Sequence, residues 1–162
     1  MLSITLPDGS KKDLPKGSTG LDLAKTIGPG LAKSAVAISI DGVQKDLEDK
    51  IEHDSSVSII TIDSDEGIEI MRHTVAAQVL AASIKTLYPE SKLAIGPTID
   101  NGFYYDFFSE KAISSDDLVT IEKEMKRVIK NKSTINKTLH SKNEVSKFFN
   151  DKKEDYKLRI IN

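Results

Sequence analysis

The chain has 162 residues, of which 38% are apolar and 30% charged, and this composition is typical of one mid-sized soluble domain or two small ones. It contains no cysteine, and its three histidines lie far apart, which excludes disulfides, thiol nucleophiles and the common zinc-ligand patterns. No stretch approaches the roughly 20 apolar residues that span a bilayer, and no secretory signal follows Met1. We therefore expect a cytoplasmic protein without membrane contact.

Charge is unevenly spread along the chain. The net charge is -2, yet residues 110–162 carry 13 basic and 9 acidic side chains. A basic surface attracts the phosphates of nucleic acid, but lysine-rich helical segments are more often simply solvated. The charge distribution alone therefore does not predict a nucleic-acid partner.

Residues 1–62 predict a small mixed sheet wrapped over one helix. Thr19 and Asp22 form a capping pattern for this helix, and Gly28 ends it. Alternating apolar residues and turn signals indicate two hairpins and a closing strand, at residues 2–6 with 11–14, 36–40 with 43–47, and 57–61. This order of elements is typical of a β-grasp unit of the ubiquitin type.

The apolar period changes from 2 to 3.6 at Asp63, which predicts a domain boundary between residues 62 and 63. Residues 63–162 then predict an α/β unit with an antiparallel sheet against a long helix, so that the whole chain is of the α+β class. Its expected elements are the long helix up to Pro89, paired strands at 93–95 and 103–108, a basic helix capped by Ser114, a strand at 134–140, a helix capped by Ser141 and Glu144, and a final strand at 156–161. A strand at the end of the chain would require a neighbour from a larger sheet or from a partner.

Several motifs resemble one family. The runs ITLPDGS at 4–10 and IGPGLAK at 27–33 resemble the TGS domain that opens the bacterial threonyl-tRNA synthetases. The motifs of the second half resemble the start of the editing domain in the same family: RHT at 72–74, LYP at 87–89, IGPTIDNGFYYD at 95–106 and DYK at 155–157. The run at 95–106 is the most specific of these motifs because of its length and its distance from His73.

The resemblance implies that the chain is the N-terminal portion of such a synthetase. The whole enzyme of this family ligates threonine to tRNA(Thr) with ATP and hydrolyses mischarged seryl-tRNA(Thr). The family binds ATP, Mg and Zn in a separate catalytic core, so we expect no cofactor and no metal in this chain. The implied partner is the acceptor end of tRNA(Thr). The parent enzyme is expected to be a homodimer through its core, and the portion alone a monomer.

The resemblance also implies the residues of an editing site. The family uses a His-x-x-x-His pair, a tyrosine and a lysine, followed by a later Asp, Cys and His. His73, Tyr105 and Lys157 match the first histidine, the tyrosine and the lysine, and Gly96 matches a loop glycine that the substrate approaches. Each has a plainer interpretation: a surface histidine, a packed aromatic, a surface lysine and a tight turn. A histidine exchanges protons near neutral pH, but one histidine cannot both activate water and hold an oxyanion.

Another residue stands in place of the second histidine of the pair. Which residue it is depends on whether positions are counted forward from His73 or backward from Pro89. Four residues after His73 comes Ala77, whereas counting back from Pro89 gives Gln78, so the helix carries one extra residue. A single insertion is commonly absorbed as a π-bulge. We predict such a bulge, with an i→i+5 backbone bond between His73 and Val79 that turns Gln78 toward His73 and Tyr105 as a substrate-binding group. In a straight α-helix, Gln78 would face solvent and Ala77 would be a simple loss of the histidine.

Three functions are compatible with these observations. The chain can be part of a synthetase, in which case we expect the isolated chain neither to charge tRNA nor to clear seryl-tRNA(Thr). Alternatively, it can be a stand-alone TGS-containing RNA-binding or regulatory module. A free-standing trans-editing protein is the third possibility, and the incomplete set of editing residues argues against it.

Overall fold

The computed structural model describes residues 1–161 and divides the chain into two compact units, Met1–Met71 and a second that begins at Arg72. The first unit thus includes the first residues of the long helix, and the domain boundary after residue 62 stays a prediction. No helix among the described residues is long and apolar enough to cross a membrane.

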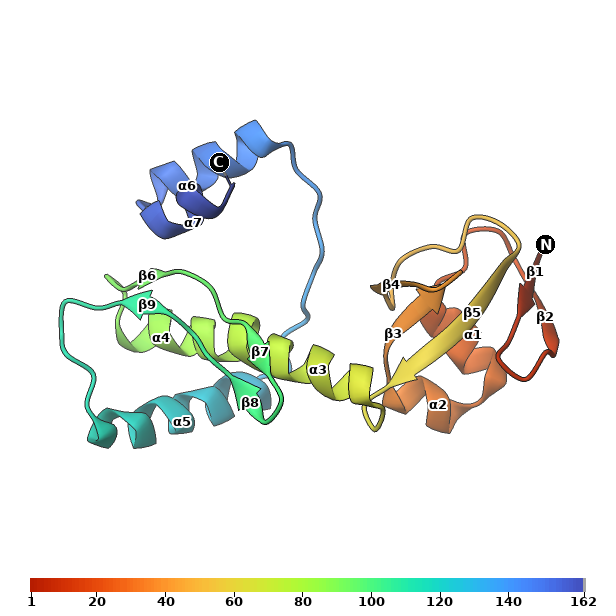
Figure 1. The fold of residues 1–162 in the computed structure, drawn as a ribbon, viewed down its shortest axis with the longest axis horizontal. Coiled ribbons are helices and arrows are strands. Elements are labelled where there is room, and N and C mark those ends of the chain that lie inside the picture. Colours follow the sequence, from red (N-terminus) through yellow and green to blue (C-terminus); the bar gives the residue numbers. More distant parts are fainter. Residues whose placement is uncertain (162) are drawn as a thin grey trace. The chain divides into compact units, whose positions relative to one another are not determined.

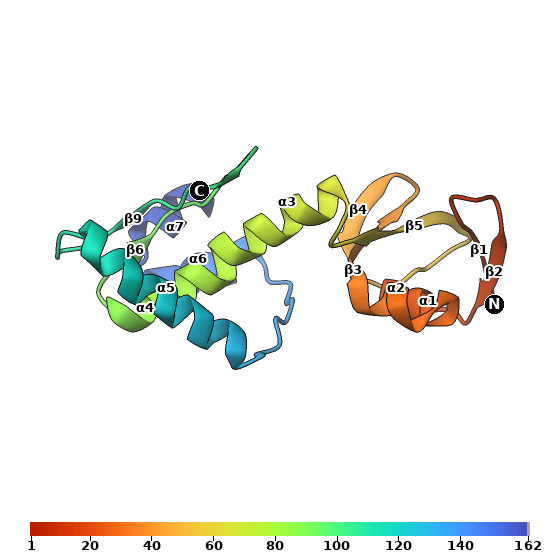
Figure 2. The ribbon, with the colours of Figure 1, turned by 90° about the horizontal axis from the view of Figure 1, so that it is seen from below.

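The first unit is a five-stranded mixed sheet with helices on one face (Figures 1 and 2). The strand order is β2-β1-β5-β3-β4, in which β1 and β5 are parallel and the other neighbours antiparallel. The α+β class and the β-grasp architecture are thus confirmed. Its elements are β1 Leu2–Thr5, β2 Lys11–Leu14, α1 Gly20–Ile27, α2 Pro29–Ser34, β3 Ala35–Ile40, β4 Val43–Asp46 and β5 Ser55–Thr61.

Local signals explain these elements. The Thr19 side chain accepts the Asp22 N–H while the Asp22 carboxylate accepts the Thr19 N–H, which is the predicted capping box of α1. Asp41 and Gly42 both have positive φ, as the tight turn between β3 and β4 requires. Helix α2 was not predicted, because Gly28 ends α1 but Pro29 directly begins the next helix as its first residue.

Apolar side chains from the strands and from α1 form one core in the first unit. Period-2 alternation points every second strand residue to the helix side, where its side chain packs against Leu23. Gly20 lies so close to Ile38 that a side chain at position 20 would overlap it. The buried core residues are Leu2, Ile4, Leu14, Leu23, Ile38, Ile40, Ile51 and Val57.

The predicted long helix is continuous but changes type in its middle. It consists of α3 Asp65–Thr74, the π-helical segment η1 Val75–Leu80 and α4 Ala81–Leu87. Ser64 caps the start, because its Oγ accepts the Gly67 N–H at 3.1 Å. Gly67 has no room for a side chain against the Thr61 carbonyl at the end of β5, so the start of α3 packs within the first unit.

The π-bulge is confirmed, with one correction. The Ala81 N–H donates to the Ala76 carbonyl, five residues back. The pair named for the bulge, His73 and Val79, was wrong, because these residues are six positions apart and the π-helical segment begins only at Val75.

The second unit adds short antiparallel strand pairs and three helices. β6 Lys92–Leu93 pairs with β9 Phe107–Phe108, and β7 Thr98–Ile99 pairs with β8 Gly102–Phe103. Backbone hydrogen bonds continue the pairing between them, such as the Ala94 N–H to the Asp106 carbonyl at 2.9 Å. The expected pairing of residues 93–95 with 103–108 is therefore confirmed. Helix α5, Ser115–Lys130, begins at the predicted Ser114 cap and packs on α4.

Two predicted strands were wrong. Residues 134–140 have no regular structure and are exposed, and residues 156–161 belong to helix α7, Asp155–Ile161. Short apolar runs are ambiguous between strand and helix, and the first turn of α7 is fixed by contacts with β6 that the sequence does not display. Because residues 156–161 are helical, the prediction that they need a neighbouring strand was also wrong. Helix α6, Lys142–Asp151, begins at the predicted Ser141–Glu144 capping box.

Candidate functional site

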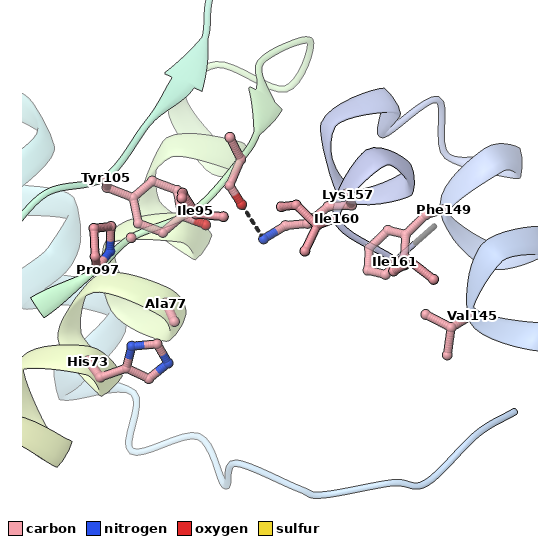
Figure 3. Close-up of a pocket in the computed structure, with 12 residues that line it drawn as sticks. His73, Ala77, Ile95, Pro97, Tyr105, Val145, Phe149, Lys157, Ile160 and Ile161 are labelled. Carbon is pink, nitrogen blue, oxygen red and sulfur yellow. Dashed lines mark hydrogen bonds between the residues drawn. The ribbon is translucent and has the colours of Figure 1, made fainter. Parts of the chain in front are cut away.

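A hollow of about 460 Å³ lies within the second unit. Residues from α3, η1, the irregular segments between β6 and β9, α6 and α7 border it (Figure 3). Four of the five predicted site residues are among those that line it. The lining residues are His73, Ala77, Ala94, Ile95, Gly96, Pro97, Tyr105, Val145, Phe149, Lys157, Ile160 and Ile161.

The long helix contributes His73 and Ala77. His73 is exposed, and Figure 3 shows its imidazole below the Ala77 methyl group at the edge of the hollow. Residues four positions apart share a helix face, which explains why these two side chains line the same space. The imidazole is available to a ligand.

Gly96 and Tyr105 form a second wall, and the ring of Tyr105 covers the Gly96 backbone. A Cβ at position 96 would lie 2.8 Å from Tyr105 Cε2 and 3.1 Å from the Tyr104 carbonyl, so only glycine permits this stacking. Burial, with a smaller effect of the Glu154 charge, raises the pKa of Tyr105. The phenol therefore stays protonated at neutral pH and can donate a hydrogen bond.

Lys157 reaches the hollow from α7. Its Nζ donates to the Ala94 carbonyl at 2.6 Å, a hydrogen bond drawn in Figure 3. An ammonium has three protons, so two remain for a ligand. Val145, Phe149 and Ile160 give the same side of the hollow an apolar surface.

Gln78 does not belong to this hollow. It is exposed and lines a separate hollow with Val79, Ala82 and residues of α5. Successive helical residues point in different directions, and the bulge leaves Ala77 facing His73 while Gln78 faces the other side. The prediction that the bulge turns Gln78 toward His73 and Tyr105 was wrong, and Ala77 occupies that place.

Sequence reasoning missed an ion pair next to the site whose carboxylate, Glu154, is buried. The Glu154 carboxylate accepts a hydrogen bond from Lys85 Nζ at 2.7 Å and from the Leu93 N–H at 3.2 Å. Glu154 directly precedes the DYK motif, but its partner is on α4, far away in sequence. Only a buried position for Glu154 could have indicated the pair, and the sequence does not show burial at that position.

The residues described contain no group of three or more His, Asp or Glu side chains able to hold a metal ion. The donor set of the hollow is one imidazole, one phenol and one ammonium, which suits a polar organic ligand better than a cation. That ATP, Mg and Zn are bound outside this chain stays a prediction.

The five-stranded unit coincides with a known domain family. The TGS domain family matches residues 2–61, which are β1 to β5 with the helices between them. Residues 2–61 are a TGS domain. The resemblance seen in the runs at 4–10 and 27–33 is thereby confirmed.

The match continues beyond the TGS domain through the second unit. Across 99% of its length, the chain is 42% identical to the threonine–tRNA ligase of Bartonella tribocorum, 44% to that of Stenotrophomonas maltophilia and 46% to that of Paramagnetospirillum magneticum. It spans 24–25% of the length of these relatives and corresponds to their N-terminal region. The hollow around His73 therefore lies in a segment that these ligases share.

Proposed function

We propose that this chain works as the N-terminal part of a threonine–tRNA ligase, and that its second unit receives the aminoacylated 3′ end of tRNA(Thr). The observation that supports this most is that the match to ligases runs through the whole second unit, where His73, Gly96, Tyr105 and Lys157 border one hollow. A substrate with hydroxyl, ester and ammonium groups suits such a mixture of donors and apolar surface.

The chemistry of these groups favours binding over cleavage. Hydrolysis of an aminoacyl ester requires a base that activates water and donors that hold the developing oxyanion. Lys157 and Tyr105 supply donors, and His73 can accept one proton. The methyl group of Ala77 supplies no second proton-transfer group. We propose that the hollow holds a seryl ester of tRNA but that these residues alone hydrolyse it slowly.

A hydrolysis-resistant ligand tests this proposal. Calorimetry would measure the affinity of the chain for the 3′-seryl amide of adenosine, in which an amide replaces the ester. We expect Lys157→Met and Tyr105→Phe each to weaken binding roughly tenfold, because each loses a hydrogen bond to the ligand. Lys147→Met, which removes an exposed lysine of α6, is the control and should bind like the unchanged chain. Absence of binding by the unchanged chain, or equal binding by all variants, would contradict the proposal.

The remaining properties follow from the same proposal. We propose that the partner nucleic acid is tRNA(Thr), that the ligase acts in the cytoplasm, and that it binds ATP, Mg and Zn and forms its dimer through residues outside this chain. The isolated chain should then sediment as a monomer, and the appearance of a dimer would contradict that part.

A further inference from the structure

The turn between α6 and α7 buries a charged side chain. Glu154 is 7% exposed, and no other charged residue among positions 1–161 is as buried. Its carboxylate has two donors, Lys85 Nζ at 2.7 Å and the Leu93 N–H at 3.2 Å. The Glu154 carboxylate is thus largely shielded from bulk water and remains paired with Lys85, whose side chain is 37% exposed.

Lys85 has no spare donor capacity. Besides Glu154, its ammonium donates to the Ser91 carbonyl at 2.7 Å and to the Pro89 carbonyl at 3.1 Å. The ion pair therefore joins α4, the turn after it, β6 and the α6–α7 turn. Desolvation of the Glu154 carboxylate offsets part of its attraction to Lys85, and apolar replacements often stabilise a protein as well as a shielded ion pair does. Stability alone is therefore a weak explanation for this pair.

The contacts around Glu154 fix where α7 begins on β6. Asp155 forms an ion pair with Lys92, Glu154 accepts the Leu93 N–H, and Lys157 donates to the Ala94 carbonyl at 2.6 Å. Three successive residues of the strand segment thus hold the first turn of α7. The position of the Lys157 ammonium in the hollow depends on this arrangement.

Glu154 also acts on the opposite wall. Its negative charge adds to burial in raising the pKa of Tyr105, so the carboxylate lies within electrostatic reach of that phenol. Glu154 itself does not line the hollow. The Tyr105 titration is therefore a readout of the Glu154 charge, whereas the contacts with Leu93 and Ala94 carry the positioning of Lys157.

We propose that Glu154, paired with Lys85, is a positioning residue that holds the first turn of α7, and with it the Lys157 ammonium, at its place beside the hollow. This inference rests on the proposed function, because the hollow must bind an aminoacylated 3′ end for the positioning to matter. The ion pair then fixes the α6–α7 turn, which directly precedes the first turn of α7, to α4 and β6.

Three variants separate positioning from general stability. Glu154→Gln keeps the size and the acceptor for the Leu93 N–H but removes the charge. The double variant Lys85→Met with Glu154→Gln removes both charges, so that no buried charge is left unpaired. Glu122→Gln removes an exposed ion pair with Lys126 on α5, outside this arrangement, and is the matched control.

Two readouts are followed by NMR in chains whose amide spectra show them folded. In Glu154→Gln, we expect the pKa of Tyr105, assigned with Tyr105→Phe, to fall, because a nearby negative charge is removed. Affinity for the 3′-seryl amide of adenosine should fall roughly tenfold as Lys157 loses its fixed place. The double variant should show both changes, and Glu122→Gln should show neither. If Glu154→Gln does not fold, the double variant carries the same test.

The outcomes distinguish this inference from the proposed function. If the unchanged chain binds the amide and both charge-removing variants bind it within twofold, with the same Tyr105 titration, the positioning role is overturned. If the unchanged chain does not bind the amide, the proposed function fails. The Tyr105 titration then still tests whether the Glu154 charge acts beside the hollow. A lowered pKa supports it, and an unchanged pKa overturns it.

Discussion

Different interactions stabilise each of the two units of this chain internally. The TGS domain has a contiguous core of eight buried apolar side chains drawn from its strands and α1. In the second unit, the buried apolar residues among those described are only Ala76, Ala81, Ile84 and Ile121. There, α7 is attached to β6 through Glu154, Asp155 and Lys157. The comparison teaches that apolar burial specifies the first unit, whereas charged contacts specify the walls of the candidate site.

The largest expected effect concerns catalysis by the second unit. We expect the purified chain to clear seryl-tRNA(Thr) at the uncatalysed rate, because Ala77 replaces a proton-transfer group and one such group is worth ~10²- to 10⁴-fold. His73→Ala should therefore leave the rate unchanged in a deacylation assay with labelled serine. Turnover by the unchanged chain that His73→Ala abolishes would show that the site is catalytically competent by itself.

The next effect concerns the core of the TGS domain. Leu23→Ala removes a fully buried side chain and should lower the free energy of unfolding of the first unit by about 2–5 kcal/mol. Leu139→Ala, at a side chain that is 88% exposed, is the matched control and should change it by less than about 0.5 kcal/mol. Urea denaturation followed by NMR signals of each unit measures both. Equal effects of the two substitutions would contradict the contrast between the units.

A smaller effect distinguishes the two sides of the long helix. Ala77→Phe places a ring in the hollow beside His73 and should weaken binding of the 3′-seryl amide of adenosine at least tenfold, or roughly 1.4 kcal/mol. Gln78→Phe places the same ring in the other hollow and should leave the affinity unchanged. If Gln78→Phe were the more damaging change, the orientation of the π-helical segment would be wrong.

The smallest effect is a pH dependence of folded-state stability, which arises in each unit from a carboxylate that caps a helix. Hydrogen bonds from the backbone and hydroxyl of Ser114 hold the pKa of Asp117 far below its usual range, with the Tyr88 hydroxyl and Lys111 adding to the effect. Asp22 at the start of α1 has a lowered pKa through the Thr19 N–H and hydroxyl, without such additional donors.

A carboxyl whose pKa is depressed on folding stabilises the folded state above its unfolded pKa of about 3.9, and this contribution is lost as the pH falls below that value. Amide exchange followed from pH 6 down to pH 1 should therefore show a larger total loss of protection in α5 than in α1. Asp117→Asn should remove this component from α5 alone. A profile of α5 that Asp117→Asn leaves unchanged would contradict the capping role.

The sequence carried different amounts of information about the two units. In the TGS domain, period-2 alternation, the Asp41-Gly42 turn and the Thr19 cap are local signals, so the strand order along the chain was predictable. In the second unit, residues 156–161 form a helix whose start is fixed by contacts with β6. These contacts join positions that are far apart in the sequence, and the short apolar run therefore suggested a strand.

The candidate site shows the same division. Resemblance to a family identified four residues that the fold brings to one hollow, and the extra residue near Ala77 predicted the π-helical segment. The direction of Gln78 was not predictable, because it depends on where the bulge begins and on the packing of α5. Glu154 and Lys85 were missed because neither is exceptional until the structure shows them paired and the Glu154 carboxylate buried.

The central claim, that the second unit holds the binding site, is tested most directly by chemical-shift mapping. The isotope-labelled chain would be titrated with the 3′-seryl amide of adenosine. The account predicts shift changes at His73, Gly96, Tyr105 and Lys157 and none in residues 2–61. Changes concentrated in the TGS domain or around Gln78, or no change at saturating concentration, would contradict it.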